Sequence, residues 1–370
     1  MKITFLHPTV NLSGGIRVVA THAQALAARG HEVRHFSVAP RRPSAVLQLK
    51  SLLHGRGLIP WSGDRPPSHL DGTGVAHTML AGPTITADQL PDADVVVATW
   101  WETAEWAAAL PASKGAKAYL MQDYEMFDHL PRDRVAATFH APLHRIAVSD
   151  YIRRMLRDHH GVEGIDLVPN AVDLDHFTAP ARTRTDGLTV GVVYTERPRK
   201  NLGLAIAALS EARARLPHLQ AVAFGVLAPV AGLALPPWVR YHRAPAERDI
   251  PGIYASADVW LFTSDSEGFG LPLLEAMACR TPVIATAAGA APELINGRNG
   301  VLVPSDATAF ADAMQRFEAM TQEEWAGFSQ AAYDTVHNYT WEDAADLFEA
   351  ALHRAMTQAP SQPLTAGPVA

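Results

Sequence analysis

Two glutamates flank a short stretch that combines the residues of a tight loop with those of a helix start. Glu267 and Glu275 are separated by seven residues, which include Gly268, Gly270 and Pro272. Glycine lets the backbone bend or approach a ligand without a Cβ in the way, and proline favours the first positions of a helix. We therefore expect a loop through both glycines and a helix that begins at Pro272, with Glu275 in its first turn.

The surrounding elements would place this stretch where α/β proteins bind ligands. Residues 259–263 form an apolar run typical of a buried strand, so the loop leaves the carboxyl end of that strand. The free amides of Phe269, Gly270 and Leu271 would then face an anion such as a diphosphate. Carboxylates also accept hydrogen bonds from vicinal hydroxyls. A lone glutamate in a first helical turn usually serves the helix dipole, and only the whole combination favours a ligand site.

A second loop carries cations that could neutralise such a phosphate. Arg197, Arg199 and Lys200 lie between a strand expected at 188–193 and a helix expected at 201–215. Taken alone, this run is more typical of a solvated approach to a helix.

The elements that position these loops alternate along the whole chain, which is the pattern of parallel sheets with crossover helices. The fold class is therefore α/β. With 370 residues the chain exceeds what one core usually holds, so we expect two doubly wound domains. We expect an N-terminal domain at 1–172, a C-terminal domain at 173–339 with a linker at about 172–187, a last helix at about 340–357 and a disordered tail at 358–370. Further elements are expected at 2–7, 16–29, 32 onward, 94–99, 116–121, 145–148, 150–161 and 220–224.

A glycine pair in the N-terminal half precedes the helix expected at 16–29. Gly14 and Gly15 lack the G-x-G-x-x-G dinucleotide fingerprint, so the pair is either part of a ligand site or a plain turn.

Composition excludes several classes of function. The net charge of −7 argues against a nucleic-acid partner, which would favour a basic excess. Cys279 is the only cysteine, so no internal disulfide can form and a reducing, cytoplasmic location is expected. The apolar start of the chain is too short for a signal peptide and is expected to be a strand.

No metal site is expected. His7, His22, His77 and His140 are scattered without the spacing of metal ligands. Asp173-Leu174-Asp175 spells a D-x-D sequence, which we interpret as coincidence because it follows an apolar strand at the domain crossover.

The segment 41–61 combines basic residues with leucines at helical spacing. It could lie on a membrane surface or line an acceptor groove, or it could be an ordinary surface helix and loop.

The stretch from Glu267 to Glu275 resembles the E-x7-E signature of retaining glycosyltransferases of family 4, which have the GT-B fold of two Rossmann-like domains facing a central cleft. The resemblance extends to Val168-Pro169-Asn170, to Pro292-Glu293-Leu294 and to the segment 299–304. It implies that Glu275 binds the nucleotide ribose and that Glu267 contacts donor-sugar hydroxyls. It also implies that the last helix crosses back to the first domain.

The resemblance further implies that Gly15, Gly268 and the amides at 269–271 meet the donor, and that Lys200 binds its diphosphate. The family's usual phosphate-binding arginine is missing from its place, so Arg197 or Arg199 could replace it. A histidine common in the family is also missing after the strand at 116–121, where this chain has Gln122-Asp123-Tyr124-Glu125. Gln122 and Asp123 are therefore candidate catalytic residues of a variant branch, beside Glu267 and Lys200.

The function expected from these residues is transfer of a sugar, with retention, from a UDP-, GDP- or TDP-sugar to an acceptor hydroxyl. The acceptor would be a glycan, a lipid-linked molecule or a small molecule in glycan or glycoconjugate biosynthesis, and no cofactor or metal is required. Peripheral membrane contact would run through the N-terminal domain. The alternatives are an epimerase or hydrolase of nucleotide sugars on the same fold, and a nucleotide-sugar-binding protein without catalysis.

Overall fold

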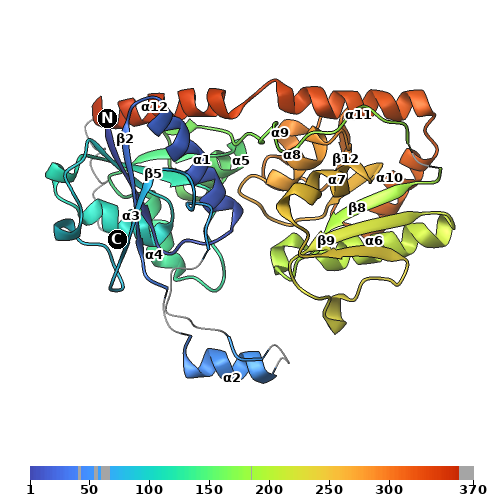
Figure 1. Cartoon of the computed structure of the whole chain (residues 1–370), viewed down its shortest axis with the longest axis horizontal. Helices are drawn as coiled ribbons and strands as arrows, with labels where there is room; N and C mark the ends of the chain where they lie inside the picture. Colours follow the sequence, from blue (N-terminus) through green and yellow to red (C-terminus); the bar gives the residue numbers. More distant parts are fainter. Residues whose placement is uncertain (41–42, 54–56, 60–66, 185, 358–370) are drawn as a thin grey trace, which may run out of the picture. The chain divides into compact units, whose positions relative to one another are not determined.

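The computed structural model describes residues 1–40, 43–53, 57–59, 67–184 and 186–357. The chain divides into two compact units (Figure 1). Unit 1 comprises residues 1–146, 160–166 and 345–370, and unit 2 comprises residues 147–159 and 167–344. The tail expected to be disordered, 358–370, lies outside the described residues.

Unit 1 is built on a seven-stranded sheet whose order is β3-β2-β1-β4-β5-β6-β7. The pairs among its first five strands are parallel, and the order reverses direction beside β1, as in doubly wound folds. Apolar runs explain the central strands, because a parallel sheet is covered on both faces. The strands are β1 (Lys2–His7), β2 (Glu32–Val38), β3 (Ala76–Leu80), β4 (Val95–Ala98), β5 (Ala116–Met121), β6 (His144–Ala147) and β7 (Ile165–Leu167).

Helices cover this sheet, and one of them comes from the end of the chain. From Ala345 onward, α12 (Trp341–Thr357) is grouped with unit 1. Its Phe348 is fully buried and packs against Phe5 and His22, with ring centroids 6.1 and 4.5 Å away. The other helices of this half are α1 (Gly14–Ala28), α2 (Ala45–Leu53), α3 (Trp101–Ala109) and α4 (Arg132–Phe139).

Unit 2 repeats the arrangement with six strands in the order β10-β9-β8-β11-β12-β13, all paired in parallel. Its core gathers the apolar faces of α6 and α10 against β8, β9 and β11. The strands are β8 (Thr189–Val193), β9 (Gln220–Gly225), β10 (Val239–Arg243), β11 (Val259–Phe262), β12 (Val283–Ala285) and β13 (Gly300–Leu302). The helices are α5 (Asp150–His160, to His159 in this unit), α6 (Leu202–Arg215), α7 (Ile250–Ala255), α8 (Leu271–Ala278), α9 (Ala291–Leu294), α10 (Ala307–Glu318) and α11 (Gln322–His337).

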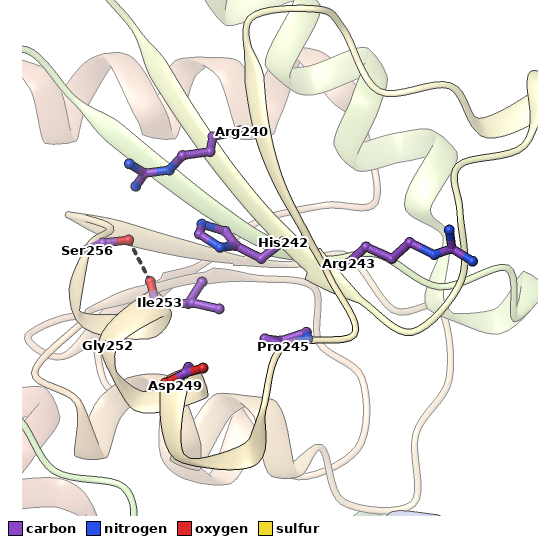
Figure 2. Close-up of a pocket in the computed structure, with 8 residues that line it drawn as sticks. All are labelled: Arg240, His242, Arg243, Pro245, Asp249, Gly252, Ile253 and Ser256. Atoms are coloured by element: carbon purple, nitrogen blue, oxygen red, sulfur yellow. Dashed lines mark hydrogen bonds between the residues drawn. The ribbon is translucent and has the colours of Figure 1, made fainter.

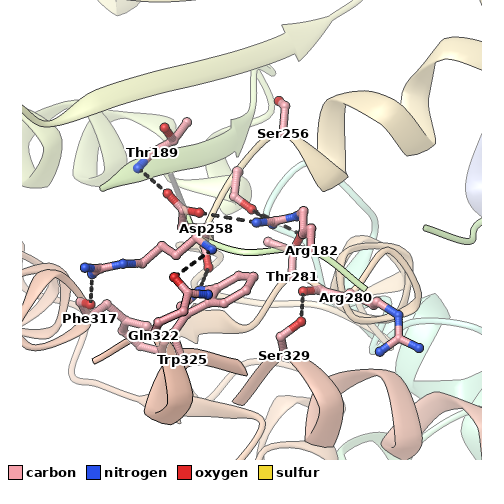
Figure 3. Close-up of polar contacts among 12 residues, drawn as sticks. Arg182, Thr189, Ser256, Asp258, Arg280, Thr281, Phe317, Gln322, Trp325 and Ser329 are labelled. Atoms are coloured by element: carbon pink, nitrogen blue, oxygen red, sulfur yellow. Dashed lines mark hydrogen bonds and ion pairs between the residues drawn. The ribbon is translucent and has the colours of Figure 1, made fainter. Parts of the chain in front are cut away.

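The buried carboxylate of Asp258 binds the segment from Arg182 to Thr189 to the core of unit 2 (Figure 3). Asp258 has no exposed surface, pairs with Arg182 at 3.3 Å and accepts a hydrogen bond from the amide of Thr189 at 2.8 Å. The Trp325 indole donates to the Asp258 carbonyl at 2.9 Å, and the Arg182 guanidinium lies over the same indole at 4.7 Å. The chain around Arg182, expected from sequence to be part of a linker, is therefore held on unit 2.

The units differ in detail from the domains expected from sequence. Residues 147–159 belong to unit 2, although the sequence-based boundary placed them in the N-terminal domain. The physical reason lies at the start of α5, whose first residues hydrogen-bond to α9 and to the loop after β11.

Candidate functional site

The loop after β11 bends at a position that only glycine fits. Gly270 has a φ of +108° and forms the N-cap of α8. A Cβ at this position would stand 2.9 Å from Cζ of Phe262. Among the described residues no side chain caps the start of α8, and a helix N-terminus of this kind favours an anion.

Glu267 is buried at the end of this loop and is held by two partners. Its side chain is 5% exposed, and its Oε1 accepts a hydrogen bond from the Ser264 hydroxyl at 2.7 Å. The same oxygen forms an ion pair with Nζ of Lys200. Gly289, at a φ of +57°, allows this approach, because a Cβ there would stand 2.7 Å from Cβ of Glu267. Lys200 and Glu267, singled out separately in the sequence, therefore meet in one charged pair.

Backbone contacts bring the two loops of this pair together. The amide of Asp265 donates to the carbonyl of Arg199 at 2.8 Å, and the Thr263 hydroxyl donates to the carbonyl of Lys200 at 3.1 Å. The Asn201 amide group also donates to the Asp265 carboxylate at 3.0 Å. These contacts fix the turn of Pro198–Lys200 beside the carboxyl end of β11.

The cationic loop leaves its two arginines in different surroundings from Lys200. The Arg197 side chain is exposed, and Arg199 contributes its carbonyl to the contact between the loops. A phosphate-binding role for Arg197 or Arg199 stays a prediction.

Glu275 lies deeper in α8 than the sequence indicated. The helix begins at Leu271, so Glu275 is its fifth residue and has left the first turn, where no acidic residue stands. A helix-dipole role is therefore not favoured for this 7% exposed carboxylate. Its Oε2 accepts a hydrogen bond from the Tyr254 hydroxyl at 2.8 Å.

Tyr254 is fully buried, with its ring centroid 4.4 Å from that of Trp260 and 5.4 Å from that of Phe224. This packing fixes the hydroxyl that orients Glu275. Sequence reasoning missed Tyr254, because a tyrosine inside an apolar run is typical of a core residue. Burial and the charge of Glu275 raise the pKa of Cys279 to about 12, so this thiol stays protonated at neutral pH.

The start of α5 is a further neighbour of the loop. The Ser149 hydroxyl donates to the carbonyl of Gly268 at 2.5 Å and accepts from the amide of Ile152 at 3.3 Å. The Glu293 carboxylate accepts from the amides of Asp150 and Tyr151 at 3.2 and 3.1 Å. Glu293 belongs to a motif that sequence reasoning noted, but its partner could not be read from the sequence, because the two segments lie more than a hundred residues apart.

In unit 1 the structure brings Gly15 and Gln122 together. A Cβ on Gly15 would stand 3.4 Å from Oε1 of Gln122, and this buried oxygen has no hydrogen-bond partner among the described residues. The adjacent Asp123 carboxylate accepts from the amide of Tyr124 at 3.0 Å. Gly15 thus lies against the segment 122–125, which stands where family 4 glycosyltransferases commonly have a histidine.

Glu125 anchors the same segment. Its Oε2 accepts hydrogen bonds from the amide of Trp101, at the start of α3, and from the Tyr119 hydroxyl, at 2.8 and 3.0 Å. Burial raises the pKa of Glu125 well above its usual range, although both hydrogen bonds oppose the shift. The hydrogen bond from the Trp101 amide links the segment of Gln122 and Asp123 to the start of α3.

The D-x-D sequence has a local structural use. Oδ1 of Asp173 accepts hydrogen bonds from the amides of Asp175 and His176, both at 3.1 Å. The side chain therefore closes its own turn, as aspartate commonly does.

A cavity of about 560 Å³ lies elsewhere in unit 2, between the edge strand β10 and α7 (Figure 2). Arg240 and His242 line it from β10, and Asp249, Ile253 and Ser256 line it from the other side. None of the predicted donor-binding residues lines this cavity.

Two family models match the chain in succession. Residues 12–176 match the model described as Glycosyltransferase Family 4, and residues 184–319 match the model described as Glycosyl transferases group 1.

Two solved structures have the same architecture over nearly the whole chain. HepE from Anabaena, solved in complex with UDP and glucose, matches with a TM-score of 0.71 and 18% identity, over 96% of this chain and 100% of its own. Sucrose-phosphate synthase from Thermosynechococcus elongatus matches with a TM-score of 0.70 and 20% identity, over 96% and 99%. The chain has a GT-B fold.

Curated relatives of this GT-B chain are glycosyltransferases. A D-inositol 3-phosphate glycosyltransferase from Mycobacteroides abscessus is 33% identical over 232 residues, which are 54% of this chain and 49% of the relative. An O-antigen chain mannosyltransferase B from Escherichia coli is 30% identical over 107 residues, which are 29% and 28% of the two chains. The chain thus spans about half or less of the length of these relatives, and the two family models that it matches are both described as glycosyltransferases.

Proposed function

We propose that this chain transfers a glycosyl group from a nucleoside diphosphate sugar to an acceptor hydroxyl, with retention of the anomeric configuration. The observation that carries the proposal is the pairing of Lys200 with Glu267 beside the N-terminus of α8. Glu275 lies about one turn into the same helix, where the Tyr254 hydroxyl donates to it. A cation, helix amides and two buried carboxylates are the groups that a diphosphate and two hydroxyl-rich rings require.

Each group has a defined part in this proposal. Lys200 and the first amides of α8 stabilise the charge that develops on the departing diphosphate, which is the main electrostatic contribution to transfer. Glu275 holds the ribose, and Glu267 holds hydroxyls of the sugar that moves. Gln122 and Asp123 of unit 1 stay candidate catalytic residues.

The nucleotide and the acceptor are chosen for testing by similarity. A UDP-sugar is the first donor to test, because a structural neighbour was solved with UDP. An inositol phosphate is the first acceptor, because relatives carry that substrate in their names.

The experiment is a thermal-shift screen of UDP-, GDP-, TDP- and ADP-sugars, followed by product analysis with and without acceptor. Stabilisation by one donor and an acceptor-dependent product with retained configuration, read from the anomeric proton coupling, support the proposal. Epimerised or hydrolysed sugar without acceptor would replace it with the corresponding activity, and donor binding without turnover on any acceptor would indicate a binding protein.

Metal independence remains a prediction, based on the use of Lys200 and helix amides as the charges that face the diphosphate. Turnover is expected to persist in excess chelator. Loss of turnover that magnesium or manganese restores would show that a metal completes the site.

A further inference from the structure

Helix α2 (Ala45–Leu53) presents its apolar side to solvent. None of its residues is buried. Val46, Leu49 and Leu53 are 65%, 57% and 77% exposed. At 3.6 residues per turn these three lie on one side of the helix together with Ala45 and Leu52, and these five residues are named the α2 apolar face.

The polar side of the same helix is bonded to the loop that follows the helix. The Gln48 side chain donates to the carbonyl of Ile59 at 2.9 Å and accepts from its amide at 2.8 Å. The Ser51 hydroxyl donates to the carbonyl of Gly57 at 2.7 Å. A surface helix normally packs its apolar side on the core, whereas α2 leaves that side exposed.

We propose that the α2 apolar face docks on an anionic lipid surface. The inference rests on α2 alone and does not depend on the proposed sugar transfer.

Charge favours lipid as the occupant. From residue 39 to residue 63 the sequence has four lysine or arginine residues and no aspartate or glutamate, although the whole chain has a net charge of −7. Among them, Lys50 stands on α2 beside the apolar face. Apolar side chains flanked by basic residues are the combination by which interfacial helices bind anionic membranes. No helix among the described residues is long and apolar enough to cross a membrane.

Size argues against a second copy of the chain as the occupant. A nine-residue helix is about 13 Å long, so one side of it offers on the order of a few hundred Å², well below the roughly 800 Å² per partner of a stable interface. A lipid surface needs no complementary partner shape, and a few inserted leucines suffice for reversible binding.

The experiment measures co-sedimentation of the full chain with vesicles of pure phosphatidylcholine and of an equal mixture of phosphatidylcholine and phosphatidylglycerol. We expect binding to the mixture, and Leu49→Gln and Leu53→Gln should each weaken it about tenfold, because each removes one inserted leucine. Leu47→Gln is the matched control, since Leu47 is 50% exposed but lies away from the apolar face, and it should change binding by less than about threefold. Lys50→Gln should weaken binding about fivefold.

Several outcomes would overturn the proposal. These are no binding to the mixed vesicles, equal binding to both lipid compositions, or equal effects of the Leu47 and Leu53 substitutions. Light scattering could give a further contradicting outcome. A dimer that Leu53→Gln dissociates would show that a second copy covers the α2 apolar face. Circular dichroism of each variant verifies that the chain stays folded.

Discussion

Glu267 and Glu275 are held by different partners, and this difference separates their expected roles. Glu267 shares its Oε1 between Ser264 and Lys200, so it stands beside the cation that would meet the diphosphate. Glu275 contacts Tyr254 instead and belongs to the body of α8. One carboxylate is therefore coupled to the phosphate charge, and the other is independent of it.

Glu275→Ala and Glu267→Ala should fail in different ways. Losing a charged hydrogen bond costs about 1.5 to 3 kcal/mol, so Glu275→Ala should weaken both the donor and the bare nucleoside diphosphate about ten- to a hundredfold. Glu267→Ala should keep the affinity for the bare nucleotide, because Lys200 remains, and should lose turnover. Calorimetry and kinetics measure both, with exposed Glu323→Ala as the control. Equal losses of nucleotide affinity in the two variants would refute the assignment.

Tyr254 is expected to act through Glu275. Tyr254→Phe keeps the packed ring and removes the hydroxyl that donates at 2.8 Å, so nucleotide affinity should fall about three- to tenfold with little change in turnover at saturating donor. Tyr241→Phe is the matched control, because it removes a hydroxyl that donates to the carbonyl of Leu227 in the same unit. If both variants lower the melting temperature alike and neither changes the affinity, Tyr254 is only a core residue.

At the scale of the elements, segments with a clear apolar period and with glycine or proline at their ends could be predicted from sequence. The strand at 2–7, the strand at 116–121 and the helix that ends near Arg215 have the expected bounds within a residue or two. Apolar runs, Gly270 and Pro272 are local signals, and local signals specify local structure.

Partners distant in sequence could not be predicted. Ser149 meets Gly268 and Glu293 meets the start of α5 only because folding brings these segments together. The exposure of the α2 leucines was equally hidden, since helical periodicity gives a face but does not say which side packs. Glu275 was expected in the first turn of its helix but lies beyond that turn. Sequence signals locate a helix better than they locate its first residue.

The buried His22 of α1, which packs against α12, predicts that the free energy of unfolding depends on pH. Burial lowers the pKa of His22 from 6.5 to about 3, beside Phe348 of α12. Because the unfolded chain takes up this proton near pH 6.5 and the folded one only near pH 3, stability falls as the pH falls through that window, by about 1.4 kcal/mol per unit for this residue.

His22→Leu should remove this contribution. Urea unfolding at pH 7 and pH 5 should show a smaller difference in the variant than in the native chain, by about 2 kcal/mol. His140→Leu is the control, because His140 is exposed and should leave the difference unchanged. An identical pH dependence in all three proteins would mean that His22 does not titrate differently on folding.

At the scale of the whole molecule, the predicted site residues are shared between two units. Lys200, Glu267 and Glu275 belong to unit 2, and Gly15 and Gln122 belong to unit 1. Lys200 and Glu267 form an ion pair in unit 2, and Gly15 lies against Gln122 in unit 1.

Hydrogen exchange along the chain tests this division of labour. A bound donor slows exchange where it orders or covers backbone amides, so a saturating nucleotide sugar should protect 197–201 and 263–275 in unit 2 and also 13–17 and 121–125 in unit 1. The bare nucleoside diphosphate should protect the same segments of unit 2, because phosphate and ribose contacts lie there. Glu275→Ala at the same ligand concentration should reduce the protection in both units, because it weakens donor binding. Protection confined to unit 2 with the complete donor would remove Gly15 from the donor-binding residues and leave unit 1 to the acceptor alone.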